Sequence, residues 1–375
     1  MSDSETEQIT DLSSPEVTTK YMTAAGIANK ALEAVIAACV SGADIASVCE
    51  LGDKVITEEA AKLYNKKDKN GERIMKGVAF PTCVCPAEIC GHYSPLKDES
   101  RVIKDGDILK IDLAAHIDGF SAVVAHTVIV GNGQVTGKAA DVVQATWNAA
   151  EAALRTIKVG ADSIEVTKVI EQVADEFGVN ALQGIYSYQM KSHQLDGGHA
   201  IPNKIYPGMN YESFQFGVNE VYGIDIVFST GEGKGRESEM RTTVFKRAHE
   251  NTYVVKTQKG REFLAEVNKI APSLCFSLRQ IDDPLLARAG SADAKRHRLI
   301  EEFPVMKEKD GEVIAQFKFT VLLLPGGTKK VTGVSFSQGA QFASDKSVKD
   351  ETLKALLASS TNPKKIKKKA AALAN

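Results

Sequence analysis

One short stretch of this 375-residue sequence recurs in similar form, and no other feature limits the possible folds as strongly. Residues 42–48 read Gly-Ala-Asp-Ile-Ala-Ser-Val, and residues 160–166 read Gly-Ala-Asp-Ser-Ile-Glu-Val. In both halves of the chain a helical pattern precedes this stretch and a second one follows it. A loop histidine and a strand aspartate then complete each half. The chain is therefore predicted to be an internal duplication.

The loop histidines and strand aspartates take equivalent places in the two halves. His92 and Asp112 belong to the first half, and His193 and Asp225 belong to the second. The order of elements indicates a duplicated α/β unit with one central, mostly antiparallel sheet and helices on its outer face. Because a duplicated fold relates equivalent residues by a pseudo-twofold axis, Asp112 and Asp225 should converge on one central cleft.

Hydrophobic spacing predicts where the elements lie. A first helix should begin near Pro15, after two serine hydroxyls suited to capping it. We expect strands at residues 107–113 and 220–227, with antiparallel neighbours at 125–130 and 242–245, a further strand at 313–321 and a last helix at 351–359. Three segments are expected: an acidic flexible N-terminus (1–13), a main domain (14–345) and a C-terminal helix with a lysine-rich tail (346–375). The main domain should consist of two halves, about 14–133 and 134–250, and a mainly helical insertion of about 251–304.

Composition limits the class of protein. Six cysteines in so long a chain do not make a disulfide framework, so we expect a reducing compartment, cytoplasm or nucleus. No stretch approaches the roughly 20 apolar residues of a membrane helix, and no membrane partner is expected. The N-terminus carries acidic residues and is neither a secretory signal nor a transit peptide.

The formal net charge of −2 hides a basic C-terminal tail. Its last dozen residues contain no acid and carry five lysines, Lys364, Lys365, Lys367, Lys368 and Lys369. A tail of this kind is typical of a segment that contacts nucleic acid. A solvated, disordered chain end explains the same lysines equally well.

Two aspartates and two histidines that face one cleft invite a metal hypothesis, because divalent ions bind carboxylate and imidazole groups. A two-metal hydrolase also needs enough anionic ligand to offset four positive charges. Strand aspartates near the ends of sheets are common, so this pattern alone is weak support for a metal site.

Five short motifs add a family resemblance. They lie at residues 79–82 (Ala-Phe-Pro-Thr), 90–95 (Cys-Gly-His-Tyr-Ser-Pro), 110–112 (Lys-Ile-Asp), 220–222 with 229–231 (Glu-Val-Tyr and Ser-Thr-Gly) and 315–317 (Ala-Gln-Phe). In order and spacing they resemble type 2 methionine aminopeptidases over nearly the whole chain. The resemblance implies an α/β (α+β) pita-bread fold. It also implies five metal-ligand positions: two aspartates, one histidine and two glutamates.

When the five metal-ligand positions of the peptidases are matched to this sequence one at a time, only some of them keep a ligand residue. Asp112 matches the first aspartate, His193 the histidine, and Asp225 the first glutamate, one methylene shorter. The second aspartate falls on Val123 and the last glutamate on Lys318. Four carboxylates become two, and an ammonium group is added that could neutralise them without a metal. We therefore expect no metal, no cofactor and no catalytic residue.

This pattern of loss resembles the proliferation-associated protein 2G4 family, also called ErbB-3-binding proteins. The shared motifs lie at residues 114–120, 124–127, 192–195, 316–320 and 353–360. The resemblance implies a non-peptidase of nucleus, nucleolus and cytoplasm that binds RNA (rRNA), associates with the large ribosomal subunit and pre-ribosomal particles, and affects ribosome biogenesis, translation and growth. The segment after the Ser-His-Gln-Leu motif, residues 196–199, is shorter than is usual in this family.

Three further expectations concern binding. His92 and His199 are expected in the cleft, and His92 matches a histidine that contacts substrate in the peptidases, so it is either a relic or a peptide-binding group. The leucines Leu353, Leu356 and Leu357 either dock as a short helix into a partner's groove or pack on the chain's own core. We expect a monomer.

Two alternative functions stay open at this point. One is an adaptor or transcriptional co-regulator that contacts regulatory proteins or DNA. The other is an active aminopeptidase with a single metal on Asp112, His193 and Asp225.

Overall fold

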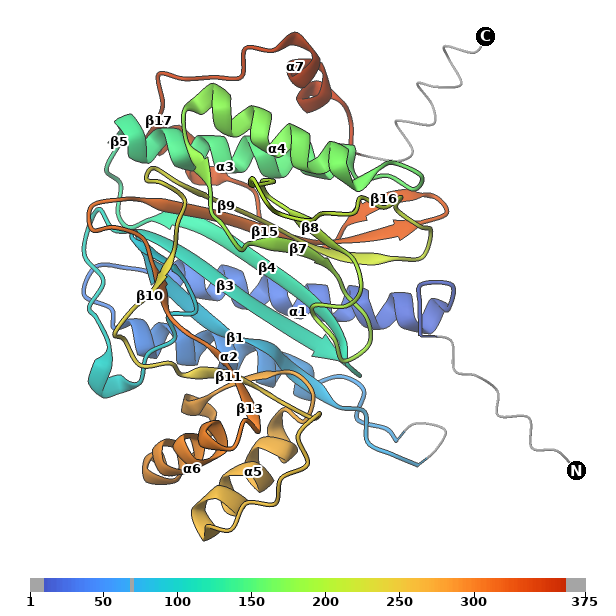
Figure 1. Ribbon diagram of the computed structural model, residues 1–375, viewed down its shortest axis with the longest axis vertical. Helices are drawn as coiled ribbons and strands as arrows, with labels where there is room; N and C mark the ends of the chain where they lie inside the picture. The colour runs from blue at the N-terminus through green and yellow to red at the C-terminus, as the bar shows by residue number, and fades with distance from the viewer. Residues whose placement is uncertain (1–9, 68–70, 362–375) are drawn as a thin grey trace, which may run out of the picture.

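The computed structural model describes residues 10–67 and 71–361 (Figure 1). Its α-helices are α1 (Pro15–Ala38), α2 (Ile45–Ala61), α3 (Gly137–Thr156), α4 (Ser163–Phe177), α5 (Gln258–Ile270), α6 (Pro284–Arg296) and α7 (Glu351–Ala358). The first helix begins at Pro15 as predicted, although Ser14 makes no side-chain capping bond. Three short 3₁₀ helices lie at Lys97–Glu99, Leu278–Gln280 and Ser337–Gln341.

The strands form one large central sheet and three small ones. They are β1 (Lys76–Pro86), β2 (Ile89–Gly91), β3 (Ile108–Ile117), β4 (Phe120–Ile129), β5 (Val135–Thr136), β6 (Asn180–Ala181), β7 (Tyr186–Gln189), β8 (Ala200–Pro202), β9 (Val221–Ser229), β10 (Arg236–Glu237), β11 (Val244–Arg247), β12 (Cys275–Ser277), β13 (Ile300–Phe303), β14 (Met306–Lys307), β15 (Ile314–Leu324), β16 (Gly327–Lys330) and β17 (Phe342–Ala343).

The central sheet has the order β1-β3-β4-β15-β9-β7-β8, and its neighbouring strands run antiparallel. The line between β4 and β15 divides it into two equivalent halves. The expected antiparallel sheet is confirmed, but one expected pairing is wrong. β11 does not pair with β9; it pairs with β12 and β13, and β15 takes the place beside β9. The second half is therefore completed by a strand that follows the insertion.

The repeated Gly-Ala-Asp stretch starts equivalent helices in the two halves. Asp44 caps α2 by accepting a bond from the backbone N–H of Ser47, and Asp162 caps α4 by accepting one from Ile164, each at 3.0 Å. The two glycines have positive φ angles of 90° and 81°, which explains why glycine stands there. The sequence repeat is thus a repeated helix-starting turn.

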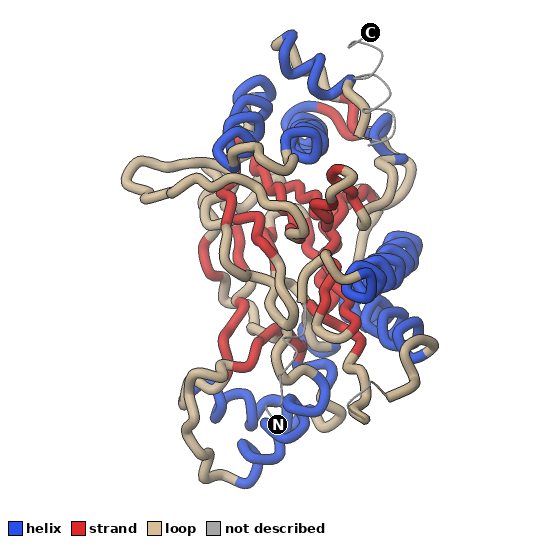
Figure 2. Tube along the Cα trace, turned by 90° about the vertical axis from the view of Figure 1, so that its right-hand side faces the viewer, coloured by secondary structure: helices blue, strands red, loops and turns tan. Residues whose placement is uncertain are grey.

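Four helices cover one face of the sheet, and Figure 2 shows the strands between these helices and the loops of the opposite face. α1 and α2 pack on β1, β3 and β4, whereas α3 packs on β15 and β9 with α4 beside it. Alternate strand residues such as Ile111 and Leu113 are buried beneath the helices. Residues between them, including Asp112, are left to face the other side.

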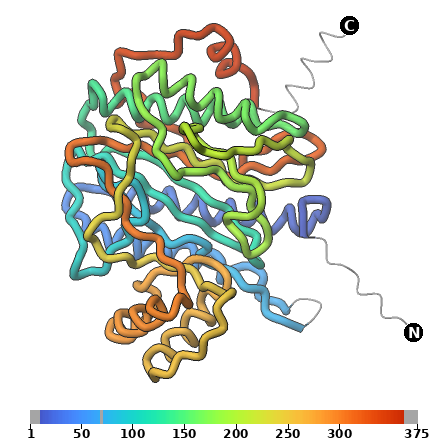
Figure 3. The backbone as a smooth tube through the Cα atoms, in the orientation of Figure 1, coloured from blue at the N-terminus to red at the C-terminus, as the bar shows by residue number. Residues whose placement is uncertain are grey.

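The insertion has its own apolar core and lies below the first half of the molecule (Figure 3). α5 and α6 pack together, and the strands β12 and β13 flank β11. The expected mainly helical insertion thus also contributes two strands. The buried Arg279 ties it to the main body: its guanidinium lies 2.9 Å from the carboxylate of Asp53 in α2 and 2.6 Å from the Ser94 hydroxyl.

The described residues near the two chain ends, 10–13 and the leucines of α7, pack against the rest of the fold. Leu12 is buried and its N–H bonds to the Asn219 carbonyl, so residues 10–13 belong to the fold. Residues 1–9 lie outside the described part of the chain. Leu353 is buried, and Leu356 and Leu357 pack partly buried on the same core, beside α3. The packing of these leucines on the chain's own core is therefore confirmed, whereas docking of the partly exposed Leu356 and Leu357 into a partner's groove stays a prediction. Among the described residues, no helix is long and apolar enough to cross a membrane.

Candidate functional site

The register of four central strands places a row of side chains across the middle of the sheet. Asp112 on β3 lies opposite Ala125 on β4, Ala125 lies opposite Lys318 on β15, and Lys318 lies opposite Asp225 on β9. Directly opposed residues of antiparallel strands point to the same face. The row therefore brings Asp112 and Asp225 together, as the duplication predicts, with Lys318 between them.

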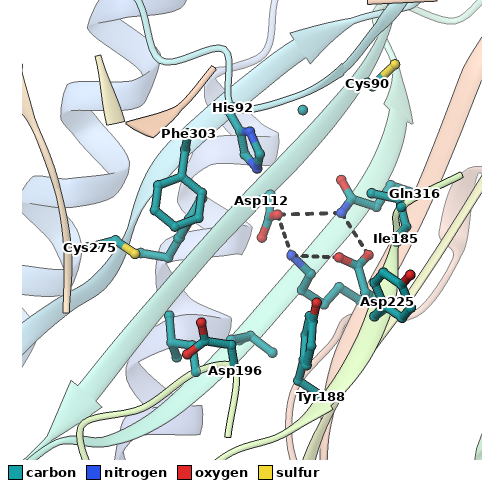
Figure 4. Close-up of a pocket in the computed structure, with 18 of the residues that line it drawn as sticks. Cys90, His92, Asp112, Ile185, Tyr188, Asp196, Asp225, Cys275, Phe303 and Gln316 are labelled. Atoms are coloured by element: carbon teal, nitrogen blue, oxygen red, sulfur yellow. Dashed lines mark hydrogen bonds and ion pairs between the residues drawn. The ribbon is translucent and has the colours of Figure 1, made fainter. Parts of the chain in front are cut away.

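Lys318 binds the carboxylates of both Asp112 and Asp225. These two aspartates and Gln316 are labelled in Figure 4. The Nζ atom of Lys318 lies 2.5 Å from Asp112 Oδ2 and 3.0 Å from Asp225 Oδ2. Gln316, two residues earlier on the same face of β15, donates its amide N–H to Asp225 Oδ1 at 2.8 Å. The sequence interpretation missed Gln316, although its two-residue spacing from Lys318 could have indicated it. The expected ammonium between two carboxylates is present.

Burial and charge oppose each other in this cluster. Burial alone lowers the pKa of Lys318, but the carboxylates of Asp112 and Asp225 more than reverse this, so the pKa lies above its ordinary value. Burial raises the pKa of Asp225, and the Lys318 ammonium works against that rise. The lysine is therefore charged at neutral pH.

The cluster forms part of the wall of a cavity of about 430 Å³. Side chains from both halves and from the insertion line it, among them Phe80, Leu182, Ile185, Met190, Phe303 and Met306. Val123, at the position of the lost aspartate, lies in this wall and is 8% exposed. The sequence interpretation missed a second ion pair there, between Lys246 and Asp196, with 3.3 Å between Nζ and Oδ1.

His92 lies in the cavity as expected, with its ring directed toward the Asp112 side chain in Figure 4. Its Nδ1 lies 3.0 Å from the Pro304 carbonyl oxygen. Because a carbonyl can only accept, Nδ1 carries the proton. Burial lowers the pKa of His92, so the neutral ring leaves Nε2 as an acceptor.

The other two histidines do not line the cavity. His193 has a left-handed φ of 60°, its N–H bonds to the Gly119 carbonyl at 2.9 Å, and its ring packs on that glycine. Its Nδ1 lies 2.7 Å from the hydroxyl of Ser273, which holds the ring at the β3–β4 turn. His199 is exposed and stacks on Phe214 with 4.0 Å between ring centroids. The expected place of His199 in the cleft is therefore wrong.

The remaining donors do not fit a pair of divalent ions. Two carboxylates remain at the cluster, and both are bound by an ammonium group that would repel a cation. Val123 offers no ligand atom, and His193 is bonded to Ser273. In the described part of the chain, no group of three or more His, Cys, Asp or Glu side chains could hold a metal ion. The five tail lysines, Lys364, Lys365, Lys367, Lys368 and Lys369, lie outside the described residues.

Comparisons with known proteins agree with this architecture. The profile of metallopeptidase family M24 matches residues 19–220, more than half of the chain. Proliferation-associated protein A of Dictyostelium discoideum is 44% identical over 366 residues, which cover 97% of this chain and 93% of that protein. This chain belongs to the M24 family, in its branch of proliferation-associated 2G4 proteins.

Two further similarities place the chain within this branch. The ErbB-3 binding protein 1 of Solanum tuberosum is 42% identical over 334 residues, which cover 88% of this chain and 85% of the potato protein. The solved structure of a thermophilic Arx1 superposes with a TM-score of 0.82 at 29% identity, over 93% of this chain and 99% of that one. This 2G4-family chain therefore has the methionine-aminopeptidase-like pita-bread fold over almost its full length.

Proposed function

We propose that this 2G4-family protein is a catalytically inactive relative of the methionine aminopeptidases. We further propose that it binds RNA and the large ribosomal subunit or its precursors and acts in ribosome biogenesis, translation and growth. In this proposal the protein works in the cytoplasm and in the nucleus and nucleolus. Its peptidase cavity takes no part in hydrolysis.

One observation carries the proposal of inactivity: the Lys318 ammonium lies between Asp112 and Asp225. Hydrolysis by two metals needs ions about 3.5–4 Å apart, with anionic ligands that offset their charge. The cluster instead has one fixed positive charge between its two carboxylates. A metal ion at this place would have to displace the ammonium from both carboxylates.

The support for RNA binding comes from the basic tail and from the family. Five lysines without an intervening acid lie at residues 364–369, soon after the end of α7 at Ala358. Lysines that contact phosphates release counterions, so such binding weakens as salt rises. The resemblance to the 2G4 family implies a lysine-rich tail and an RNA partner, and the match to relatives over almost the full length supports extending this implication to the present chain.

Co-sedimentation with purified large ribosomal subunits tests the partner. We expect the full chain to pellet with the subunit. A variant with glutamine at all five tail lysines should bind less tightly, and the slope of log affinity against log salt should flatten by up to about 3.5, since each contact with single-stranded RNA contributes about 0.7. A matched control places five glutamines at exposed lysines of the folded domain: Lys54, Lys62, Lys97, Lys168 and Lys269. Equal losses in both variants would contradict a specific role of the tail.

Hydrolysis of a peptide with N-terminal methionine, assayed with added Mn²⁺ or Co²⁺, tests the inactivity. We expect no turnover above a buffer control and no stoichiometric metal in the purified protein. Turnover together with bound metal would support the single-metal aminopeptidase instead. The ribosome assay does not depend on this result, so the two parts of the proposal can fail separately.

A second candidate function is an adaptor for regulatory proteins. It is favoured by the name of the potato relative, an ErbB-3 binding protein. Crosslinking that recovers defined protein partners but no RNA would favour the adaptor. Recovery of ribosomal RNA would favour the first proposal.

A further inference from the structure

The loop between β4 and β5 presents an asparagine directly before a glycine. Asn132 and Gly133 are both exposed, and apart from the chain neighbours no atom lies within 4 Å of the place that a Cβ of Gly133 would take. Because glycine has no side chain, its backbone nitrogen is accessible and its backbone rotates more freely than that of other residues. The pair therefore has the openness that a reaction between the two residues needs.

The two groups that would react are not held by hydrogen bonds. Among the described residues, none bonds to the side-chain amide of Asn132, and none accepts the backbone N–H of Gly133. The pairing of β4 with β3 ends at Ile129, and β5 begins at Val135, so Asn132 and Gly133 lie outside any strand pairing. The Asn132 side chain can therefore turn its Cγ toward the nitrogen of Gly133.

The other asparagines do not combine exposure with a following glycine. In the described part of the chain, only Asn132 directly precedes a glycine. Asn203 is buried, and the exposed Asn210 precedes Tyr211, whose side chain hinders an approach to its backbone nitrogen. Asn70 also precedes a glycine, but it lies outside the described residues. Asn210 is therefore the matched comparison for Asn132.

We infer that Asn132 is a site of spontaneous deamidation, with water as the co-reactant. The backbone nitrogen of Gly133 attacks Asn132 Cγ and forms a nitrogen–carbon bond, which closes a succinimide ring. The side-chain nitrogen leaves as ammonia and takes with it the proton that the backbone nitrogen loses. Water then opens the ring at either carbonyl, which yields aspartate or isoaspartate. Either product adds one negative charge, and in isoaspartate the main chain runs through Cβ and Cγ.

The isoaspartate alters a contact that holds this loop. The Gln341 side chain donates to the Gly131 carbonyl oxygen at 3.2 Å, and its Nε2 lies 3.5 Å from the Gly133 carbonyl oxygen. These carbonyls stand on either side of residue 132, and the added main-chain atom moves them apart, so one amide no longer reaches both. Gln341 directly precedes β17, which pairs with β5 (Figure 1). Isoaspartate formation therefore loosens this two-stranded sheet.

Peptide mapping by mass spectrometry, on full-length protein incubated at neutral and at mildly alkaline pH, tests the site. We expect the peptide that contains Asn132 to gain the mass of one deamidation and to separate into two products, before the peptide that contains Asn210 changes. The rate should rise with pH, because the attacking nitrogen must lose its proton. An unchanged Asn132 peptide, or equal rates at Asn132 and Asn210, would overturn the inference.

Two variants test the route through the Gly133 nitrogen. Gly133→Ala adds a methyl group in open space at a residue without a positive φ, so the variant should fold, and its deamidation should be several-fold slower. Asn132→Gln should stay unmodified over the same period, because its ring would be one atom larger and closes more slowly. The control Asn210→Gln should leave the rate at Asn132 unchanged. Deamidation of Gly133→Ala at the unaltered rate would contradict this route.

Hydrogen exchange of fresh and fully converted protein tests the structural consequence. We expect faster exchange at residues 341–343 of the converted protein and unchanged exchange in β3 and β9. Fresh Asn132→Asp carries the new charge without the added main-chain atom, so it should exchange as the unmodified protein does. Unchanged protection of residues 341–343 after conversion would contradict the role of Gln341. Neither assay involves RNA, so this inference and the proposed function can fail separately.

Discussion

Lys318 and Asp225 lie directly opposite each other on β15 and β9, with 3.0 Å between Nζ and Oδ2. Asp112 is brought to the same ammonium group through the neighbouring pair of strands. A register slip of one residue on β15 would turn Lys318 to the helix-covered face of the sheet. The ion triad therefore requires the correct register of β15 against β4 and β9, and it also stabilises this register.

Lys318→Met should destabilise the protein markedly. The substitution leaves two carboxylates that are 14% and 13% exposed without a counter-charge. Breaking a buried pair from one side costs about 3–5 kcal/mol. Urea unfolding at neutral pH would measure the loss.

The exposed Lys295 provides the comparison for this prediction, because its pair with Glu302 lies on the surface. Lys295→Met should cost less than about 1 kcal/mol. Similar losses for the two variants would mean that Lys318 adds no more than an ordinary surface pair.

A metal site should be recoverable by the double variant Val123→Asp, Lys318→Glu. It restores two carboxylates to the cavity wall and removes the fixed positive charge. We expect it to bind about one equivalent of Mn²⁺, because His193 remains held by Ser273 and cannot complete a second ion's ligands. Electron paramagnetic resonance of free Mn²⁺ would measure the stoichiometry. Each single variant is a control and should bind no Mn²⁺ at the same concentration.

The internal repeat predicted that Asp112 and Asp225 meet, and the resemblance to the methionine aminopeptidases predicted that Lys318 lies beside them. The sequence did not predict that β15 replaces β11 beside β9. Both segments are predicted as strands by their local sequence, and the choice between them depends on the long-range packing of the insertion, whose strands β12 and β13 flank β11. His193 was misplaced for a related reason, since Ser273, 80 residues away, decides where its ring points.

His126 should make the protein less stable as the pH falls below 7. It is 5% exposed on β4 and packs edge to face on Phe317 at 5.1 Å. Burial, and to a lesser degree the Lys330 charge, lower its pKa to about 4. The unfolded chain takes up this proton near pH 6.5, so stability is complete above that pH and is lost as the pH falls from about 6.5 to about 4.

The expected loss from this one group is about 2 kcal/mol between pH 7 and pH 5. Unfolding curves at the two pH values would show it. His126→Phe keeps an aromatic ring in the cluster and should reduce the loss by that amount. His199→Phe, at an exposed ring, should leave the loss unchanged. An unchanged pH dependence in His126→Phe would contradict the assignment.

The Asp53–Arg279 pair should hold the insertion to the main body. Arg279 is 3% exposed, and Asp53 also accepts the backbone N–H of Thr82 at 2.7 Å. Arg279→Met leaves a buried carboxylate without its counter-charge and should cost about 3–5 kcal/mol. Arg241→Met breaks the exposed pair with Glu99 and should cost less than about 1 kcal/mol. Equal midpoints in urea for the two variants would contradict this role.

Leu353→Ala should release α7 without unfolding the domain. An isolated helix of eight residues is not stable in water, so α7 depends on its contacts. Leu353 is the buried side chain of this helix. Just before the helix, the Glu176 carboxylate accepts hydrogen bonds from the backbone N–H groups of Lys349 and Asp350 at 2.7 and 2.9 Å. Loss of the leucine should cost about 2–5 kcal/mol of docking free energy.

Hydrogen exchange should then show lost protection at residues 353–358, while β3 and β9 keep theirs. Lys354→Ala removes an exposed side chain of the same helix and should change neither region. Exchange that rises throughout the sheet would mean that α7 is part of the cooperative core. RNA affinity gives the second readout. A tail that binds phosphates by charge alone does not need a docked α7, so Leu353→Ala should bind RNA as the unaltered protein does.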